Sequence, residues 1–369
     1  MEINDFNFDY WAMLEPMKYF DRPDDSKLSE ALLKKKYDMI ENAGNEYIAT
    51  QKWDGEWTMF IRGQNDDVLI RSRSLSSVTG KYGDKTLHLP HLAKEMLEWP
   101  EGTVVLAEVC FPTLGKVSTD VGTILRCLPD RAVERQRKDT WLVSKVFDIL
   151  SWNGENLMEV GYYDRLKLVL EKFSDENKWF FHTFVYDRDF QSYADEIIRA
   201  GGEGVVIQRK DSTYTPGKRP AWQTLKLKQR MEEMELPVIS AKDPTKEYQG
   251  KDTVGWKYWE RIDGSLCEGQ LYNSNEAGLI AVSKAYYYGW KMGVTVDFEG
   301  TMVDVSSGLT DEDREWLATE EAKRTIDSGH LYATIKAMQV ASLGGLRHPV
   351  ILKLRIMDDA MLDEKIEVE

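Results

Sequence analysis

Lys52 is the residue whose type and setting could support covalent chemistry. It stands in the run Lys52-Trp53-Asp54-Gly55, in a turn between two strand-like segments. A neutral lysine amine can attack a phosphoryl group, but its ordinary pKa of about 10.4 leaves little of the neutral form at pH 7. Burial and nearby cations would lower that pKa. A lysine in a turn is usually just exposed to solvent, so this short run is weak evidence by itself.

Two carboxylates and two lysines follow at the ends of strand-like segments. Glu108 ends one buried apolar run, and Glu203 directly precedes another. Lys226 and Lys228 share one face of a further run, since side chains of a strand alternate between its two faces. Each of these residues alone also fits a structural explanation, such as a strand end or a solvated face.

The order and spacing of these segments resemble the motifs of a known family. With Ser72-Arg73-Ser74 and the run 147–155, FDILSWNGE, they are similar to the covalent nucleotidyltransferases, and within them to short, bacteriophage-type ATP-dependent DNA ligases. The run 147–155 resembles a DNA ligase more than an RNA ligase or a capping enzyme. Near the C-terminus, Leu346-Arg347-His348-Pro349 followed by Arg355 resembles the last ligase motif. The resemblance covers nearly the whole chain.

This resemblance implies a role for each matching residue. Lys52 would carry AMP, with Asp54 beside it in the catalytic centre, and ATP would be the cofactor. Glu108 and Glu203 would hold Mg²⁺, with Mn²⁺ as an alternative. The residues implied in nucleotide binding are Thr50, Gln51, Lys52, Arg73, Glu108, Phe147, Glu203, Lys226, Lys228, Arg347 and Arg355. The residues implied in DNA binding are Arg73, Arg209, Lys210, Lys218 and Arg219.

Three positions depart from the family pattern. Trp57 stands where the family usually has an arginine, so Arg62 or Arg71 would have to supply the missing cation. Thr50 stands where a glutamate often reads the adenine amino group. After Arg355 the family often has Asp-Lys, whereas this chain has Asp358-Asp359 two residues further on. None of these changes removes the nucleophile or the two acids.

The resemblance implies an α+β fold in two domains. Residues 1–235 would form the adenylation domain, a nucleotidyltransferase domain of antiparallel sheets with helices that is ATP-grasp-like, after a short helical lead-in. Residues 236–369 would form a β-barrel OB-fold domain of about five strands with an inserted helix. The predicted strands are 47–52, 56–62, 67–72, 103–109, 141–150, 204–208, 265–272, 278–283, 294–305 and 350–356. The predicted helices are 159–173, 189–200 and 310–322.

Composition limits the class of protein. The 48 basic and 63 acidic residues give a net charge of −15, which by itself argues against a polyanionic partner. Seven basic residues nevertheless gather between Gln208 and Arg230, with Asp211 as the only acid among them. The three cysteines are far apart, and no long apolar segment or signal peptide is evident. We therefore expect a cytoplasmic monomer, in the host cytoplasm if the source is viral, without a membrane partner.

The expected function is the sealing of nicks in duplex DNA between a 3′-hydroxyl and a 5′-phosphate. It would pass through a lysyl-AMP intermediate and an adenylated DNA intermediate. The alternative enzyme is an RNA ligase or an mRNA-capping type of nucleotidyltransferase, since the superfamily shares the fold while the site decides the substrate. An alternative of another class is a non-catalytic protein that binds nicks. The motivation for it is Trp57, which stands where the family usually has a phosphate-binding arginine.

Overall fold

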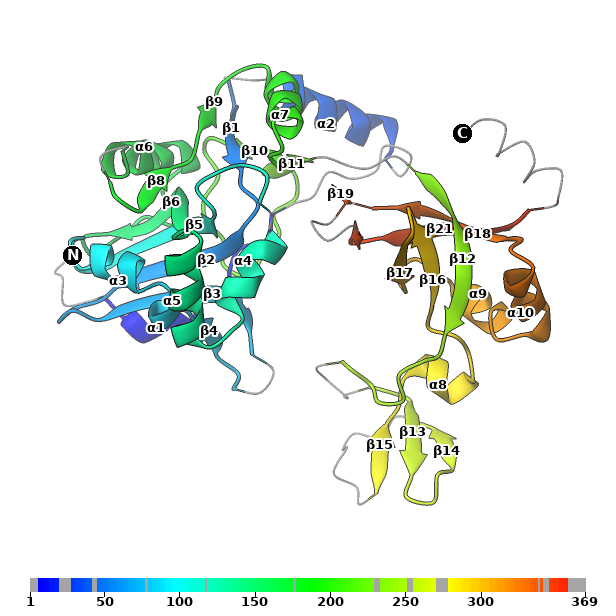
Figure 1. Ribbon diagram of the computed structural model, residues 1–369. Coiled ribbons are helices and arrows are strands. Elements are labelled where there is room, and N and C mark those ends of the chain that lie inside the picture. Colours follow the sequence, from blue (N-terminus) through cyan, green and yellow to red (C-terminus); the bar gives the residue numbers. More distant parts are fainter. Residues whose placement is uncertain are drawn as a thin grey trace. The chain divides into compact units, whose positions relative to one another are not determined.

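The computed structural model divides the chain into two compact units, Met1–Gln229 and Arg230–Glu369. Figure 1 shows both units. The structure describes residues 6–19, 28–41, 45–76, 79–116, 118–174, 177–228, 233–250, 255–269, 278–337, 339–340 and 345–357. Asp358 and Asp359, which were noted as a departure from the family pattern, lie outside these residues.

The first unit contains a four-stranded antiparallel sheet that carries Lys52. Its strands are β1 (Tyr47–Lys52), β9 (Val185–Tyr186), β10 (Gly204–Arg209) and β11 (Thr224–Lys228), in the order β11-β10-β1-β9. The helix α7 (Phe190–Arg199) packs against β10 and β11. It buries Phe190, Ala194 and Ile197, whose spacing places them on one helix face. The helix α2 (Glu30–Glu41) lies within the predicted helical lead-in and packs against α7.

A second sheet of the same unit has seven strands. These are β2 (Glu56–Arg62), β3 (Val68–Leu75), β4 (Tyr82–Asp84), β5 (Thr103–Cys110), β6 (Val143–Trp152), β7 (Glu155–Asn156) and β8 (Phe180–His182). The strands β2 and β5 are central and buried on both faces. Along β2, Phe60 belongs to one hydrophobic cluster while Met59 and Ile61 belong to another. This alternation explains why these strands read as continuous apolar runs.

Helices cover the second sheet. They are α1 (Phe8–Met13), α3 (Pro90–Met96), α4 (Ser118–Leu125), α5 (Pro129–Lys138) and α6 (Tyr162–Lys172), with a short 3₁₀ turn η3 (Thr86–His88). The helix α6 packs against β6. The predicted helices 159–173 and 189–200 are confirmed as α6 and α7, whereas α3, α4 and α5 were not predicted.

The second unit is built on a five-stranded antiparallel sheet. Its strands are β12 (Met234–Lys242), β16 (Gly293–Phe298), β17 (Thr301–Val305), β18 (Leu331–Lys336) and β21 (Val350–Ile356), in the order β17-β16-β12-β18-β21. The predicted boundary between 235 and 236 falls inside β12, whose residues Met234 and Glu235 already pair with β18. The OB-fold assignment of this unit stays a prediction.

Smaller elements complete the second unit. They are β13 (Tyr258–Arg261), β14 (Leu266–Glu268), β15 (Leu279–Ala281), α8 (Lys284–Tyr288), α9 (Asp311–Trp316), α10 (Glu320–Asp327), β19 (Gln339–Val340) and β20 (Leu346–Arg347). The predicted strand 294–305 is a hairpin, because Glu299 and Gly300 both have positive φ, as a two-residue type I′ turn requires. The predicted helix 310–322 is two helices, α9 and α10. Within the described residues, no helix is long and apolar enough to span a membrane.

The turn between β1 and β2 makes a close approach that only glycine permits. A Cβ atom on Gly55 would lie 2.2 Å from the carbonyl oxygen of Val109 on β5. We expect Gly55→Ala to destabilise the protein by about 1–3 kcal/mol, because the turn must move away from β5. Urea unfolding should show this loss. The matched control is Gly269→Ala, whose added Cβ would meet no atom within 4 Å, and a loss of equal size in both variants would contradict this explanation.

Candidate active site

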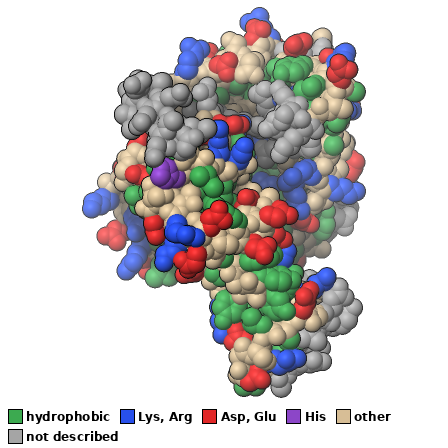
Figure 2. Space-filling view, turned by 90° about the vertical axis from the view of Figure 1, so that its right-hand side faces the viewer, with side chains coloured by type: hydrophobic (Ala, Val, Ile, Leu, Met, Phe, Trp, Pro, Cys, Tyr) green, Lys and Arg blue, Asp and Glu red, His purple; other side chains and the backbone are tan. Residues whose placement is uncertain are grey.

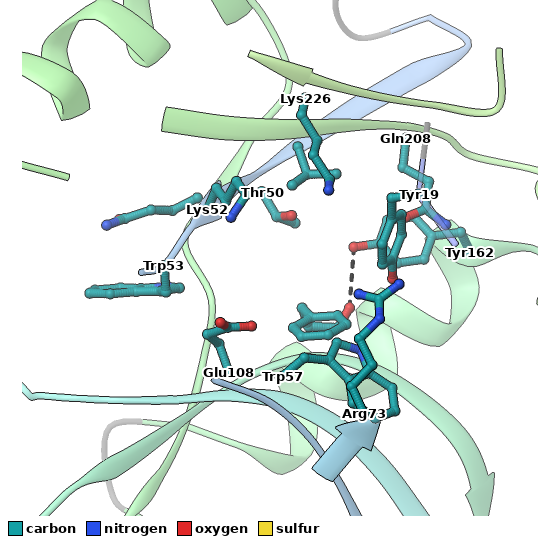
Figure 3. A pocket seen from close by; sticks show the side chains of 13 residues that line it. Tyr19, Thr50, Lys52, Trp53, Trp57, Arg73, Glu108, Tyr162, Gln208 and Lys226 are labelled. Carbon is teal, nitrogen blue, oxygen red and sulfur yellow. Dashed lines mark hydrogen bonds between the residues drawn. The ribbon is translucent and has the colours of Figure 1, made fainter. Parts of the chain in front are cut away.

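A cavity of about 150 Å³ lies between the two sheets of the first unit. The four-stranded sheet supplies one wall and the seven-stranded sheet the other (Figure 3). Its lining residues are Tyr19, Thr50, Gln51, Lys52, Trp53, Trp57, Arg73, Glu108, Phe147, Tyr162, Val206, Gln208 and Lys226. Seven of the residues that the resemblance implied in nucleotide binding line this cavity. They are Thr50, Gln51, Lys52, Arg73, Glu108, Phe147 and Lys226.

Lys52 is held at one end of this cavity by a carboxylate that is distant in sequence. Its Nζ donates a hydrogen bond of 2.5 Å to Oε2 of Glu203, 151 residues further along the chain. The pairing of β1 with β10 brings them together, because Lys52 lies opposite Gly204. A Cβ atom on Gly204, where φ is +127°, would lie 2.0 Å from the carbonyl oxygen of Leu227. Glycine at position 204 therefore lets β10 lie close to β11 beside Lys52 of β1.

Carboxylates, rather than cations, dominate the surroundings of Lys52. Burial would lower the pKa of its amine, but the negative charges of Glu203, Glu108 and Asp54 outweigh this effect and raise the pKa above its ordinary value. Burial thus acts in the expected direction, but in the protein by itself the carboxylates reverse its effect on the pKa of Lys52. The amine in this state is an ammonium ion, so the negative charge around it must be offset before it can react as a nucleophile.

Glu108 lines the cavity on β5 and shares this electrostatic environment. Burial, together with the charges of Glu203 and Asp54, raises the pKa of its carboxyl to about 7, although Lys52 acts in the opposite direction. The backbone N–H of Gly55 donates to Oε1 of Glu108 at 3.2 Å. Asp54 accepts a hydrogen bond of 3.0 Å from the backbone N–H of Ser118 at the start of α4. Asp54 thus ties the turn to α4 and does not line the cavity.

The seven-stranded wall presents an aromatic ring and an arginine. Phe147 on β6 lines the cavity, whereas its neighbour Asp148 is fully buried and pairs with Arg165 of α6. Arg73 on β3 donates to the carbonyl oxygen of Met17 at 3.3 Å. The guanidinium carbon of Arg73 lies 5.8 Å from the ring centre of Trp57, within cation–π range.

Arg62 and Arg71 do not replace the arginine missing at Trp57. Arg62 is buried and donates to Asp66 at 2.9 Å. Arg71 is fully buried and donates to the carbonyl oxygen of Leu14 at 2.5 Å. Neither of them lines the cavity.

Six lining residues were not predicted as site residues. They are Tyr19, Trp53, Trp57, Tyr162, Val206 and Gln208. Val206 and Gln208 follow from strand periodicity, because Val206 lies opposite Thr50 across the β1–β10 pairing and Gln208 is two residues further on. No strand periodicity marks Tyr19 or Tyr162 as a cavity-lining residue. Tyr19 ends the described N-terminal segment, and Tyr162 begins α6.

Several predicted site residues lie elsewhere. Lys228 shares a strand with Lys226 but does not line the cavity. Arg347 on β20 and Arg355 on β21 belong to the second unit, where Arg355 donates to Glu235 at 2.6 Å. The predicted DNA-binding residues Lys218 and Arg219 are exposed on the loop before β11.

Besides Arg73, which lines the cavity, the remaining two predicted DNA-binding residues are already engaged within the first unit. Arg209 is paired with Asp211 at 2.5 Å, and the ammonium of Lys210 lies 5.0 Å from the ring centre of Tyr163. Figure 2 shows basic and acidic side chains interspersed over the face that it displays, rather than one broad basic field.

No group of three or more His, Cys, Asp or Glu side chains is placed to hold a metal ion within the described part of the chain. The cavity wall does combine a lysine amine, the carboxylate of Glu108, a second lysine, an aromatic ring and an arginine. Glu203 does not line the cavity but accepts a hydrogen bond from the Lys52 amine. This set is suited to a phosphorylated ligand that carries a planar base and brings a divalent cation with it.

Comparisons with known proteins agree with this chemistry. The family model described as "ATP dependent DNA ligase domain" matches residues 28–228, more than half of the chain. The DNA ligase of Methanoculleus marisnigri is 31% identical over 204 residues, which are 55% of this chain and 35% of that protein. The DNA ligase of Nitrosopumilus maritimus is 27% identical over 207 residues, or 53% of this chain and 33% of that protein. The chain spans about a third of the length of these two curated relatives.

Solved structures share the fold over most of the chain. One from an analysis of Lig E DNA ligases has a TM-score of 0.54 at 15% identity and covers 85% of this chain and 94% of its own. Another, Pmar-Lig_PreS3, has a TM-score of 0.58 at 19% identity and covers 93% of this chain and 68% of its own. At these identities the likeness establishes the fold alone.

Proposed function

The chain belongs to the ATP-dependent DNA ligase family, and we propose that it seals nicks in duplex DNA with ATP through an adenylate on Lys52. The observation that carries this proposal is the position of the Lys52 amine, at one end of a cavity that also contains Phe147 and Lys226. The family model covers the segment that holds all of these residues. We propose in addition that the protein acts as a monomer on nicked duplex DNA.

Three transfers make up the proposed reaction. The Lys52 nitrogen attacks the α-phosphorus of ATP, so a phosphorus–nitrogen bond forms and pyrophosphate leaves. An oxygen of the 5′-phosphate at a nick then attacks the same phosphorus, which breaks the bond to Lys52 and returns the amine. Finally the 3′-hydroxyl attacks the 5′-phosphate, the phosphodiester forms and AMP leaves. In-line displacement of this kind depends mainly on positioning and charge neutralisation.

The protein's own residues supply that positioning. Phe147 would support the base, Lys226 would contact the phosphate, and Arg73 would contact the ribose or, later, the nick phosphate, all from the cavity wall. From the second unit, Arg347 and Arg355 are proposed to bind the departing pyrophosphate. Arg355 would first have to leave its ion pair with Glu235.

Mg²⁺ is the metal that we propose to accompany the triphosphate, with Mn²⁺ as the alternative. Two acids fit this role, since Mg²⁺ is usually bound by one or two carboxylates together with substrate phosphates. Glu108 and Glu203 would hold it, because each lies close enough to Lys52 to affect its pKa. When bound, the ion neutralises phosphate charge and offsets the carboxylates that keep the Lys52 amine protonated.

Labelling with radioactive ATP followed by addition of a nicked duplex tests the proposal. The expected result is a protein that gains the mass of one AMP in the presence of Mg²⁺ and loses it when nicked DNA is added and sealed. Labelling by GTP, or sealing of nicked RNA in preference to DNA, would support a capping enzyme or an RNA ligase instead. Binding of nicks without any adenylate would indicate a non-catalytic protein.

Binding of nicked DNA is expected to weaken steeply with salt, because contacts to phosphates release counterions. Replacing both Lys218 and Arg219 with alanine should lower the slope of log affinity against log salt by about one for each phosphate that the loop no longer binds. Fluorescence anisotropy over a salt series measures this slope. Replacing both Lys34 and Lys167 with alanine removes the same two charges and is the matched control, since both are exposed lysines that pair with Asp38 and Asp164. An unchanged slope in the double variant would remove this loop from the DNA interface.

A further inference from the structure

Three side chains form a row across the seven-stranded wall of the cavity, and the proposed transfers use only the outer two. Trp57 of β2 lies opposite Glu108 of β5. On its other side it lies beside Arg73 of β3, because the antiparallel register of β2 and β3, continued by one residue, puts them opposite each other. All three residues line the cavity, and Figure 3 shows them along its lower side. From β3 to β5 the row therefore consists of a cation, an aromatic ring and a carboxylate.

The ring of Trp57 is held in place by the packing around it. Its side chain is 9% exposed and belongs to a hydrophobic cluster that includes Met59 of the same strand and Leu106 of β5. The guanidinium carbon of Arg71, which is fully buried and hydrogen-bonded to the carbonyl oxygen of Leu14, lies 5.9 Å from the ring centre of Trp57. A side chain packed in this way keeps its rotamer, so it can serve as a fixed surface for a longer and more mobile neighbour.

The guanidinium of Arg73 is the neighbour that this ring supports. Its central carbon lies 5.8 Å from the ring centre of Trp57, within cation–π range. Within the described residues, Arg73 donates one hydrogen bond, of 3.3 Å, to the carbonyl oxygen of Met17, which is longer than usual for such a bond. Since a guanidinium carries several N–H donors, this leaves donors for a phosphorylated ligand. The aromatic contact therefore contributes to where the guanidinium lies.

The same ring separates two opposite charges. Arg73 and Glu108 stand two strands apart, which places their Cα atoms roughly 10 Å from each other. Over a small residue at position 57, the long arginine side chain could reach the carboxylate and form an ion pair, and neither group would then be available to a ligand. A cation at position 57 would instead repel Arg73 and itself attract Glu108. The uncharged indole of Trp57 avoids both results.

We propose that Trp57 is a positioning residue, whose indole holds Arg73 towards a phosphorylated ligand and keeps it apart from Glu108. The inference rests on the proposed use of ATP and of a nicked duplex, because these supply the ribose and the phosphate that Arg73 would contact. It gives the departure from the family pattern at position 57 a physical role. The cavity has one guanidinium on this wall, and the ring that stands in place of a second one orients the first.

A double-mutant cycle on Trp57 and Arg73 tests this role, with kcat/KM for labelling by ATP and the single-turnover rate of nick sealing as readouts. Trp57→Leu should lower at least one of them about three- to thirty-fold, the range that corresponds to a cation–π contact. In protein that already carries Arg73→Ala, the same change should cost less than about two-fold, since the ring has no guanidinium to hold. Trp57→Phe keeps an aromatic face and should recover most of the loss. Binding of ATP and of nicked DNA to Lys52→Ala protein gives the same cycle without chemistry.

Trp99→Leu is the matched control, because Trp99 is a buried tryptophan of a different hydrophobic cluster and does not line the cavity. It should leave both readouts unchanged. Urea unfolding checks that each variant is folded, and Trp57→Met replaces the leucine variant if that one is not. Unchanged readouts in Trp57→Leu, or a loss equally large with and without Arg73, overturn the proposal and leave the proposed function standing. If ATP does not label the wild-type protein, the proposed function fails and this inference fails with it.

Discussion

Lys52→Ala is expected to lose nucleotide labelling and the sealing of ordinary nicks by roughly four orders of magnitude or more. The reason is that the first transfer needs an amine at this place in the cavity. Lys226 lines the same cavity but extends from β11, a different strand, so it cannot reproduce the attack geometry. Intact-protein mass spectrometry after incubation with ATP and Mg²⁺ measures the adenylate directly.

Lys52→Arg separates charge from nucleophilicity. It keeps the positive charge beside Glu203, but a guanidinium with a pKa above about 12 does not supply a neutral nitrogen. It should be as inactive in labelling as the alanine variant while binding ATP better. Labelling of either variant at a normal rate would show that the nucleophile lies elsewhere.

The alanine variant should still seal a nick whose 5′-phosphate already carries AMP. The last transfer uses the 3′-hydroxyl as nucleophile and AMP as leaving group, so no lysine amine takes part. A pre-adenylated nick supplied to Lys52→Ala protein tests this directly. Lys167→Ala, on the exposed face of α6, controls for the loss of a lysine and should keep all three steps. Failure on the pre-adenylated nick would point to a wider disturbance of the site.

Breaking the ion pair of Asp148 and Arg165 is expected to cause the largest loss of stability. Both side chains have no solvent exposure, and the guanidinium is bidentate, with hydrogen bonds of 2.8 and 3.0 Å to the two carboxylate oxygens. Removing one partner leaves a buried charge without compensation, which costs about 3–5 kcal/mol. Asp148→Ala should show this loss in urea unfolding monitored by tryptophan fluorescence.

The controls for this experiment come from the same chain. Replacing both residues together, as in Asp148→Leu with Arg165→Met, should cost less than Asp148→Ala, since no charge is left buried alone. The exposed pair of Arg209 and Asp211 provides the contrast, and Arg209→Ala should change stability by about 1 kcal/mol or less. If the double replacement were as damaging as the single one, packing rather than charge would explain the effect.

The sequence predicted those site residues that follow short, ordered motifs. Lys52, Glu108 and Phe147 each end or interrupt a strand-like run, and all three line one cavity. The role of Phe147 was implied by the resemblance alone; in the structure it lines the cavity, whereas its neighbour Asp148 is buried and pairs with Arg165. Strand alternation put Lys226 and Lys228 on one face, but only Lys226 reaches the cavity, because position along a strand matters as well as the face.

Other features could not be predicted because they depend on long-range packing. Tyr19 and Tyr162 line the cavity from a terminal segment and a helix start, where no periodicity marks a ligand-facing residue. The raised pKa of Lys52 also escaped prediction, because its cause is the approach of Glu203, Glu108 and Asp54 from separate segments. A sequence motif names the charged residues of a site without giving the distances that decide their protonation.

The pairing of β1 with both β9 and β10 has a consequence for synthesis on the ribosome. The strand that ends in Lys52 is made early, yet both of its neighbours in the sheet come much later in the chain, since Ala49 pairs with Tyr186 and Thr50 with Val206. A nascent chain that stops short of β9 therefore presents β1 with both edges open. Nascent chains of increasing length should accordingly stay inert towards ATP at least until β10 has left the exit tunnel and docked, so the lysine waits for strands that are translated long after it.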